Sequence, residues 1–170
     1  MSRPLRVDPI AEARRQWAAR WPGAPLAAMA AVTSVMRAQQ VLLAHLNDAL
    51  RPFGLTFPRY EALMLLLFTR AGALPLGKIG ERLQVHRTSV TNIIDKLERD
   101  ELVRRIPHAE DRRTTLAEIT DEGRRVALAA TEAMHAIGFG LGALADADQD
   151  ALTSLLRGLR VAAGDFAEPV

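Results

Sequence analysis

Five polar residues fall within six positions of the chain, and their side chains could hydrogen-bond to a nucleic acid. They are Arg87, Thr88, Ser89, Thr91 and Asn92. Arginine can hold guanine and asparagine can hold adenine by paired hydrogen bonds, while serine and threonine reach phosphates and base edges without bulk. Lys96 extends the same polar face. Taken alone, such a face is more often ordinary solvated surface.

A second group, Asp111, Arg112 and Arg113, lies in a polar stretch between two β-branched segments. A guanidinium at the tip of a hairpin can enter a minor groove, where the negative potential of DNA is concentrated. A carboxylate two residues away can hold that guanidinium by paired hydrogen bonds. The two groups together, in this order, indicate DNA recognition more strongly than either one does.

The elements that would position these groups follow from apolar spacing. We expect a short strand at 73–74, a helix over 76–83, a tight turn at 84–85 and a second helix over 86–99 whose apolar residues face inward. Strands over 103–106 and 114–119 would flank the polar tip. This order is typical of a winged helix-turn-helix, in a chain that is mainly α-helical with a small β-hairpin wing.

Long helices flank this region in the sequence. Helical spacing predicts one helix over 29–50, a second and central helix over 57–70 capped by Thr56, and a third that begins after Thr120 and extends to Leu141. Asp146 and Gln149 form a candidate capping box for the last helix. Its leucines form a stripe typical of a dimer interface, namely Leu152, Leu155, Leu156 and Leu159.

Composition excludes several classes of function. The 170 residues include no cysteine, so disulfides, thiolate zinc sites and thiol switches are excluded, and the four histidines lack ligand spacing. We find no phosphate-binding loop or catalytic triad order, and we expect no enzyme activity, no catalytic residue, no metal and no cofactor. The longest apolar run, 62–68, is too short to span a bilayer, so we expect a soluble, cytoplasmic protein without a membrane partner.

Charge is distributed unevenly along the chain. The net charge is +2, but residues 1–113 carry 18 basic against 11 acidic side chains, whereas residues 114–170 carry 4 against 9. Such asymmetry is compatible with an anionic partner on one side of the molecule, although charge also drifts along chains without any function.

Three segments resemble the multiple-antibiotic-resistance regulator (MarR) family of winged-helix transcription factors. They are GLTFPRYEALMLL (54–66), LPLGKIGERLQVHRTSVTNIIDKLERDELVRR (74–105) and DRRTTLAEITDEG (111–123). The resemblance implies that 86–96 is the recognition helix, that Asp111-x-Arg113 is the wing motif whose arginine enters the minor groove, and that Arg112 contacts the DNA backbone. It also implies a homodimer, and a repressor that binds pseudo-palindromic duplex DNA.

The same resemblance divides the chain into functional regions. Residues 1–22 would be a helical N-terminal extension, 53–120 the DNA-binding winged helix-turn-helix, and 23–52 with 121–165 the helical dimerisation region. One position departs from the family pattern, because Glu101 stands where glycine is usual. A non-glycine residue in the left-handed conformation of a helix end should cost about 1 kcal/mol or force another exit geometry.

The resemblance further implies release of DNA when a small anionic or aromatic effector binds. Candidate ligand residues are Trp17, Met36, Gln40, His45, Tyr60, Glu61 and Met64. Trp17 is included because 8–21 resembles the leading helix of the urate-responsive branch, although that branch has aspartate at Glu61 and we find no counterpart of its ligand-binding arginine. Packing in the core is the alternative for the tryptophan, tyrosine and methionines. An alternative for the whole chain is a helical protein-interaction module that does not bind DNA.

Overall fold

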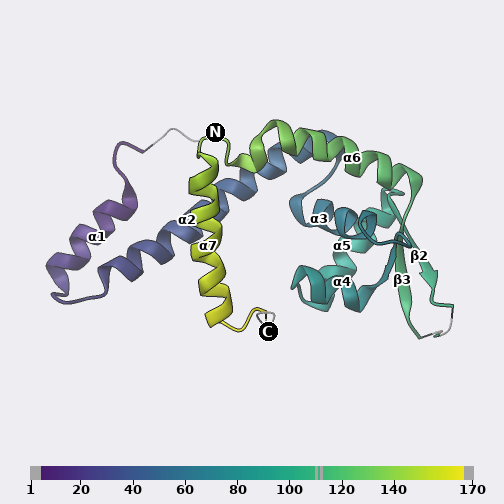
Figure 1. Cartoon of the computed structure of the whole chain (residues 1–170), viewed down its shortest axis with the longest axis horizontal. Helices are drawn as coiled ribbons and strands as arrows, with labels where there is room; N and C mark the ends of the chain where they lie inside the picture. Colours follow the sequence, from purple (N-terminus) through teal and green to yellow (C-terminus); the bar gives the residue numbers. More distant parts are fainter. Residues whose placement is uncertain (1–4, 110, 112, 167–170) are drawn as a thin grey trace. The chain divides into compact units, whose positions relative to one another are not determined.

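The computed structural model describes residues 5–109, 111 and 113–166 (Figure 1). The helices are α1 (Pro9–Arg20), α2 (Leu26–Leu50), α3 (Phe57–Leu67), α4 (Leu76–Leu83), α5 (Arg87–Arg99), α6 (Asp121–Ala136) and α7 (Asp146–Ala162), with short 3-10 turns η1 (Arg51–Phe53) and η2 (Gly138–Gly140). The strands are β1 (Ala73–Pro75), β2 (Val103–Pro107) and β3 (Thr115–Ile119). Contacts divide the chain into two units, Met1–His45 and Leu46–Val170.

The first unit contains α1 and most of α2. Asp8 caps α1, because its carboxylate accepts a hydrogen bond of 2.9 Å from the Ile10 N–H. Its Trp17 and Trp21 rings meet edge to face, with centroids 5.0 Å apart. Both tryptophans are exposed, as is every residue of α2 from 31 to 41. Residues 9–20 thus form a helix, as expected from the sequence, and none of its residues is buried.

The second unit is a winged helix-turn-helix. Its sheet is antiparallel with the order β1-β3-β2, and Arg104 pairs with Glu118 in the β2–β3 register. A single core lies among α3, α4, α5, α6 and the sheet, and its largest fully buried side chains include Leu63, Leu66, Ile79, Ile94 and Leu97. This is the predicted fold, and the predicted inward face of the second helix is confirmed, with Val90, Ile94 and Leu97 buried and Ile93 half-buried.

The wing and α6 are joined by a close backbone approach at Gly123. The Thr120 hydroxyl accepts a hydrogen bond of 2.9 Å from the Gly123 N–H, as the predicted cap requires, and donates one of 2.8 Å to the Glu101 carbonyl. A Cβ atom at Gly123 would lie 2.0 Å from the Leu102 carbonyl oxygen. Only glycine therefore allows α6 to begin this close to β2.

Four local predictions were wrong. The α3 helix ends at Leu67 rather than at residue 70. Just beyond its end, the Thr69 hydroxyl donates to the Leu65 carbonyl, and Phe68 is 79% exposed. The α6 helix ends at Ala136, because the chain turns left-handed at Gly138, Phe139 and Gly140. Gln149 bonds the Leu144 carbonyl instead of forming a capping box, and α7 is capped by Ala145. The Phe57 N–H is satisfied by the Asn47 side chain rather than by Thr56.

One segment in the described part of the chain, Leu26–Phe53, is long and apolar enough to cross a membrane by length and composition alone. Polar residues from Thr33 onward divide this segment into short apolar runs, so the longest uninterrupted run did not reveal it. Core helices of soluble proteins and signal sequences pass the same test. None of the most apolar window is buried, although Leu46 and Leu50 near its end are buried in the core of the second unit.

Candidate nucleic-acid interface

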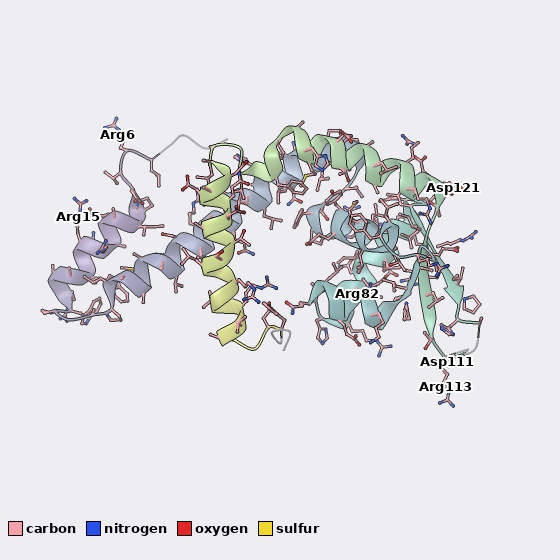
Figure 2. The ribbon with its side chains drawn as sticks, in the orientation of Figure 1. Arg6, Arg15, Arg82, Asp111, Arg113 and Asp121 are labelled. Carbon is pink, nitrogen blue, oxygen red and sulfur yellow. The ribbon has the colours of Figure 1, made fainter. Side chains whose placement is uncertain are left out.

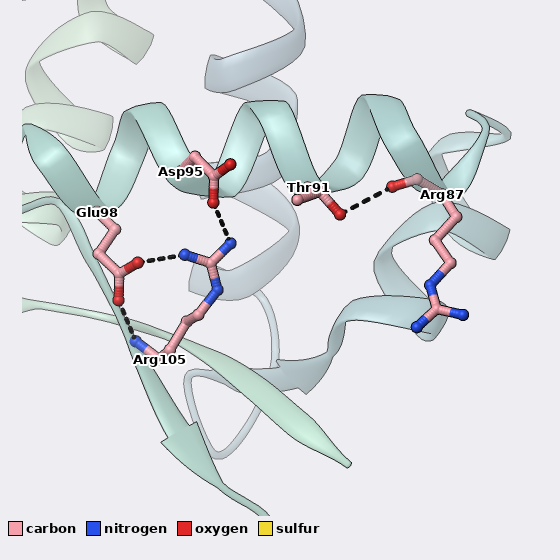
Figure 3. Close-up of polar contacts among 5 residues, drawn as sticks. All are labelled: Arg87, Thr91, Asp95, Glu98 and Arg105. Atoms are coloured by element: carbon pink, nitrogen blue, oxygen red, sulfur yellow. Dashed lines mark hydrogen bonds and ion pairs between the residues drawn. The ribbon is translucent and has the colours of Figure 1, made fainter. Parts of the chain in front are cut away.

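The polar face predicted from the sequence is presented to solvent by the first turns of α5. Arg87, Thr88, Ser89, Thr91, Asn92 and Lys96 are all exposed. The cap is His86, whose Nδ1 accepts the Thr88 N–H at 3.3 Å. The Thr91 hydroxyl donates to the Arg87 carbonyl at 3.2 Å, while the Arg87 side chain extends away from the helix (Figure 3). Because the opposite face is anchored in the core, the polar face is held outward.

The second half of α5 is fastened to the wing by Arg105 of β2. The Arg105 guanidinium bonds the carboxylates of Asp95 and Glu98, and the Arg105 N–H donates to Glu98 Oε1 at 3.0 Å (Figure 3). Partial burial lowers the pKa of Arg105, but the hydrogen bonds that its guanidinium donates to the Asp95 and Glu98 carboxylates outweigh this effect and raise that pKa overall. The clamp, defined as Asp95, Glu98 and Arg105, fixes α5 relative to the hairpin.

The wing tip is shaped by Asp111, although not in the way the sequence predicted. Its carboxylate accepts the Arg113 N–H at 3.0 Å and the Thr114 hydroxyl at 2.7 Å, so it stabilises the backbone turn and does not hold the Arg113 guanidinium. First the Thr114 hydroxyl and then the Arg113 N–H lower the pKa of Asp111. The Arg113 side chain is left pointing away from the hairpin (Figure 2). The predicted contact Arg112 lies outside the described residues.

Two features of this surface, the partners of Arg59 and of Arg105, were missed by the sequence analysis, whereas the position of Glu101 was anticipated. Arg59 of α3 forms an ion pair of 3.2 Å with Asp100 at the end of α5. Asp95 and Glu98 are three residues apart on one helix face, a spacing that could have indicated a shared partner, but the partner Arg105 depends on the register of β2. Glu101 does adopt the left-handed conformation of a helix end, with φ of 59°, so the family geometry is kept despite the missing glycine.

The seven ligand candidates fall into two sets. Tyr60, Glu61 and Met64 line a groove of the second unit, which we call the α3–α6 groove, together with Phe57, Leu65, Phe68, Leu83, Thr131, His135 and Phe139. Trp17, Met36, Gln40 and His45 belong to the first unit and are exposed there. Tyr60 is itself 5% exposed, and its hydroxyl lies 3.0 Å from the Thr131 hydroxyl. Among the residues that the structure describes, no group of three histidine or acidic side chains could hold a metal ion.

Comparison with known proteins agrees with this geometry. The profile of the MarR family matches residues 55–115. Sco5413, a MarR family transcriptional regulator from Streptomyces coelicolor, has a solved structure that is 53% identical, with a TM-score of 0.78 over 86% of this chain and 100% of that chain.

Two curated relatives come from Bacillus subtilis. The uncharacterized HTH-type transcriptional regulator YhbI is 31% identical over 71% of this chain and 73% of its own length. The HTH-type transcriptional regulator MhqR is 37% identical over 51% of this chain, and the match spans 59% of MhqR. These matches, together with the exposed polar face of α5 and the adjoining wing, show that the protein belongs to the MarR family of DNA-binding transcriptional regulators.

Proposed function

We propose that the protein is a homodimeric repressor of the cytoplasm that binds a pseudo-palindromic DNA site and is released by a small anionic or aromatic effector. The observation that carries the DNA-binding mode is the pairing of an exposed polar face on α5 with an outward-pointing arginine at the wing tip. In this mode Arg87, Thr88, Ser89, Thr91, Asn92 and Lys96 contact the major groove, while Arg113 enters the minor groove. Asp111 positions Arg113, and Arg112 contacts the backbone.

Dimer formation is supported by large apolar side chains that stay exposed to solvent in the described part of the single chain. On α7 none of the residues is buried, and Leu155 and Leu159 are 75% and 62% exposed. On α2, Val32 and Met36 are 62% and 55% exposed. Exposed apolar rows of this kind favour association. A twofold dimer would place the two α5 helices about one turn of DNA apart, roughly 34 Å or 10 base pairs.

Regulation would follow from differential affinity. A ligand that binds one arrangement of the dimer better than the DNA-bound arrangement lowers DNA affinity by linkage. The α3–α6 groove is the candidate effector site, since it joins α3 of the DNA-binding region to α6 of the proposed dimerisation region. At the far end of α7, Gln84 in the turn before α5 donates a 3.0 Å hydrogen bond to the Asp165 carbonyl. That bond links α7 to the helix-turn-helix itself.

The test is a band-shift assay on genomic fragments selected with the purified protein, including the DNA upstream of its own coding sequence. We expect enrichment of an inverted repeat and a salt-dependent, sequence-specific shift. Failure to enrich any sequence would contradict the DNA-reading role and would favour the protein-interaction module. Reporter expression that rises when the gene is deleted would support repression, and a fall would indicate activation instead.

A further inference from the structure

The α3–α6 groove contains two titratable side chains without a hydrogen bond or ion pair to any described residue, Glu61 and His135. The remaining lining is largely apolar and aromatic, with Phe57, Phe68 and Phe139 contributing rings. His135 packs against Phe139, with ring centroids 6.0 Å apart. The Tyr60 hydroxyl is already satisfied by Thr131 at 3.0 Å. The groove therefore offers a carboxylate, an imidazole and several ring faces to a ligand.

The charge of the groove discriminates between ligand classes. Its described lining contains one acidic side chain, Glu61, and neither lysine nor arginine. An anion here would meet the Glu61 carboxylate, and His135 is the one basic side chain of the described lining beside it. Glu61 is an exposed residue, but the partial desolvation of its carboxylate raises its pKa, and no positive charge acts against that rise. Ring faces also attract cations, most strongly when water is excluded.

We propose that the α3–α6 groove binds a lipophilic cation, an aromatic ligand with a positive charge, and that Glu61 selects the sign of that charge. The inference rests on the proposed effector role of the groove and narrows its ligand class. Apolar lining supplies affinity by removing the ligand's hydrocarbon surface from water. Glu61 and the rings supply charge selectivity, so anionic aromatic ligands are excluded from this site.

A pair of probes with the same shape and opposite charge tests the proposal directly. Tetraphenylphosphonium and tetraphenylborate are titrated into the full-length protein by calorimetry in sodium buffer at pH 8. We expect the cation to bind more tightly than the anion. Replacing Glu61→Gln should weaken cation binding by about five- to tenfold, the effect of one partly shielded charge pair, and should improve binding of the anion.

Glu132→Gln is the matched control, because Glu132 is exposed on α6 but does not line the groove. It should leave both affinities unchanged. Tighter binding of tetraphenylborate by the unmodified protein, or equal cation affinity in the Glu61→Gln variant and the control, would overturn the inference. A folding check by thermal unfolding of each variant ensures that a lost affinity is not a lost structure.

DNA binding measured in the same preparations separates this inference from the proposed function. A protein that shifts its DNA site but does not bind the cation selectively refutes the cation site and leaves the DNA-binding role intact. A protein that binds the cation through Glu61 but retains DNA at saturating cation supports the ligand class and contradicts regulation through the groove. If the cation dissociates the DNA complex of the unmodified protein but not that of Glu61→Gln at the same concentration, the result supports both the cation site and regulation through the groove.

Discussion

Helices α5 and α7 have similar amphipathic sequences and very different surroundings. The apolar face of α5 is covered, with Val90, Ile94 and Leu97 buried, and only its polar face is exposed. On α7 the equivalent leucines stay exposed, Leu155 to 75% and Leu159 to 62%. The packing of α5 is therefore complete within one chain, whereas no residue of α7 is buried. If α5 reads DNA and α7 joins two chains, as proposed, the two roles can be tested by separate substitutions.

The largest effect should follow from charging the leucine stripe of α7. In the double variant Leu155→Asp and Leu159→Asp, two carboxylates replace apolar side chains at the proposed dimer interface. We expect the molar mass from light scattering to halve and DNA affinity to fall on the order of 100-fold, because one half-site contact is lost. The α5 surface should stay folded by circular dichroism. A variant that remains dimeric and binds DNA normally would show that α7 is not the interface.

Removing the wing arginine should have the next largest effect. Arg113→Ala should cost about 1–3 kcal/mol of DNA-binding free energy, since a minor-groove contact is lost without any change to the fold. Arg125→Ala is the control, because Arg125 pairs with Glu122 on the exposed side of α6. Asn92→Ala should change base preference more than total affinity. If Arg113→Ala, Asn92→Ala and the control Arg125→Ala all bind DNA with the same affinity, the protein-interaction module is favoured.

The clamp between α5 and the wing should contribute to stability. Arg105→Met removes a guanidinium that two carboxylates share, and we expect a loss of about 1–2 kcal/mol of unfolding free energy. Arg104→Met breaks only the exposed cross-strand pair with Glu118, so it should leave the free energy of unfolding nearly unchanged. Urea unfolding measures both. Similar losses in the two variants would mean that the clamp is an ordinary surface pair.

The left-handed conformation of Glu101 at the end of α5 predicts a small gain in the free energy of unfolding when a glycine replaces this residue. Glu101→Gly should stabilise the protein by about 1 kcal/mol, because φ of 59° is costly for a residue with a side chain and free for glycine. Glu132→Gly, in the middle of α6, should instead destabilise it by a similar amount. A destabilised Glu101→Gly variant would show that the Glu101 side chain stabilises the wing in another way.

The smallest effect concerns pH at the wing tip. The pKa of Asp111 is lowered in the folded protein by the bonds from Thr114 and Arg113, so its stabilisation is fully present above the ordinary carboxyl pKa of about 4. The stabilisation is lost as the pH falls through the lowered value. The protection factors of the Arg113 and Thr114 amides, which correct for the intrinsic pH dependence of exchange, should therefore fall in acid. Asp111→Asn should remove this pH dependence, and an unchanged profile would contradict the role of the carboxylate.

The sequence predicted the winged helix-turn-helix fold well, because the fold depends on local periodicity. The 3.6-residue spacing of Val90, Ile94 and Leu97 identified the buried face of α5, and the spacing of the two strand segments located the wing. The role of Asp111 was mistaken although turn chemistry could have predicted it, since an aspartate commonly bonds the backbone two residues on. Arg105 and the α3–α6 groove were beyond prediction, because they require the register of β2 and the packing of α6 against α3.

The central claim is that paired α5 helices and their wings read one face of a duplex. Hydroxyl-radical and methylation-protection footprinting of the selected DNA site tests it most directly. We predict two protected major-groove patches with centres about 10 base pairs apart, flanked by minor-groove protection that disappears in Arg113→Ala. Protection at a single patch, or flanking protection that persists in Arg113→Ala, would contradict it.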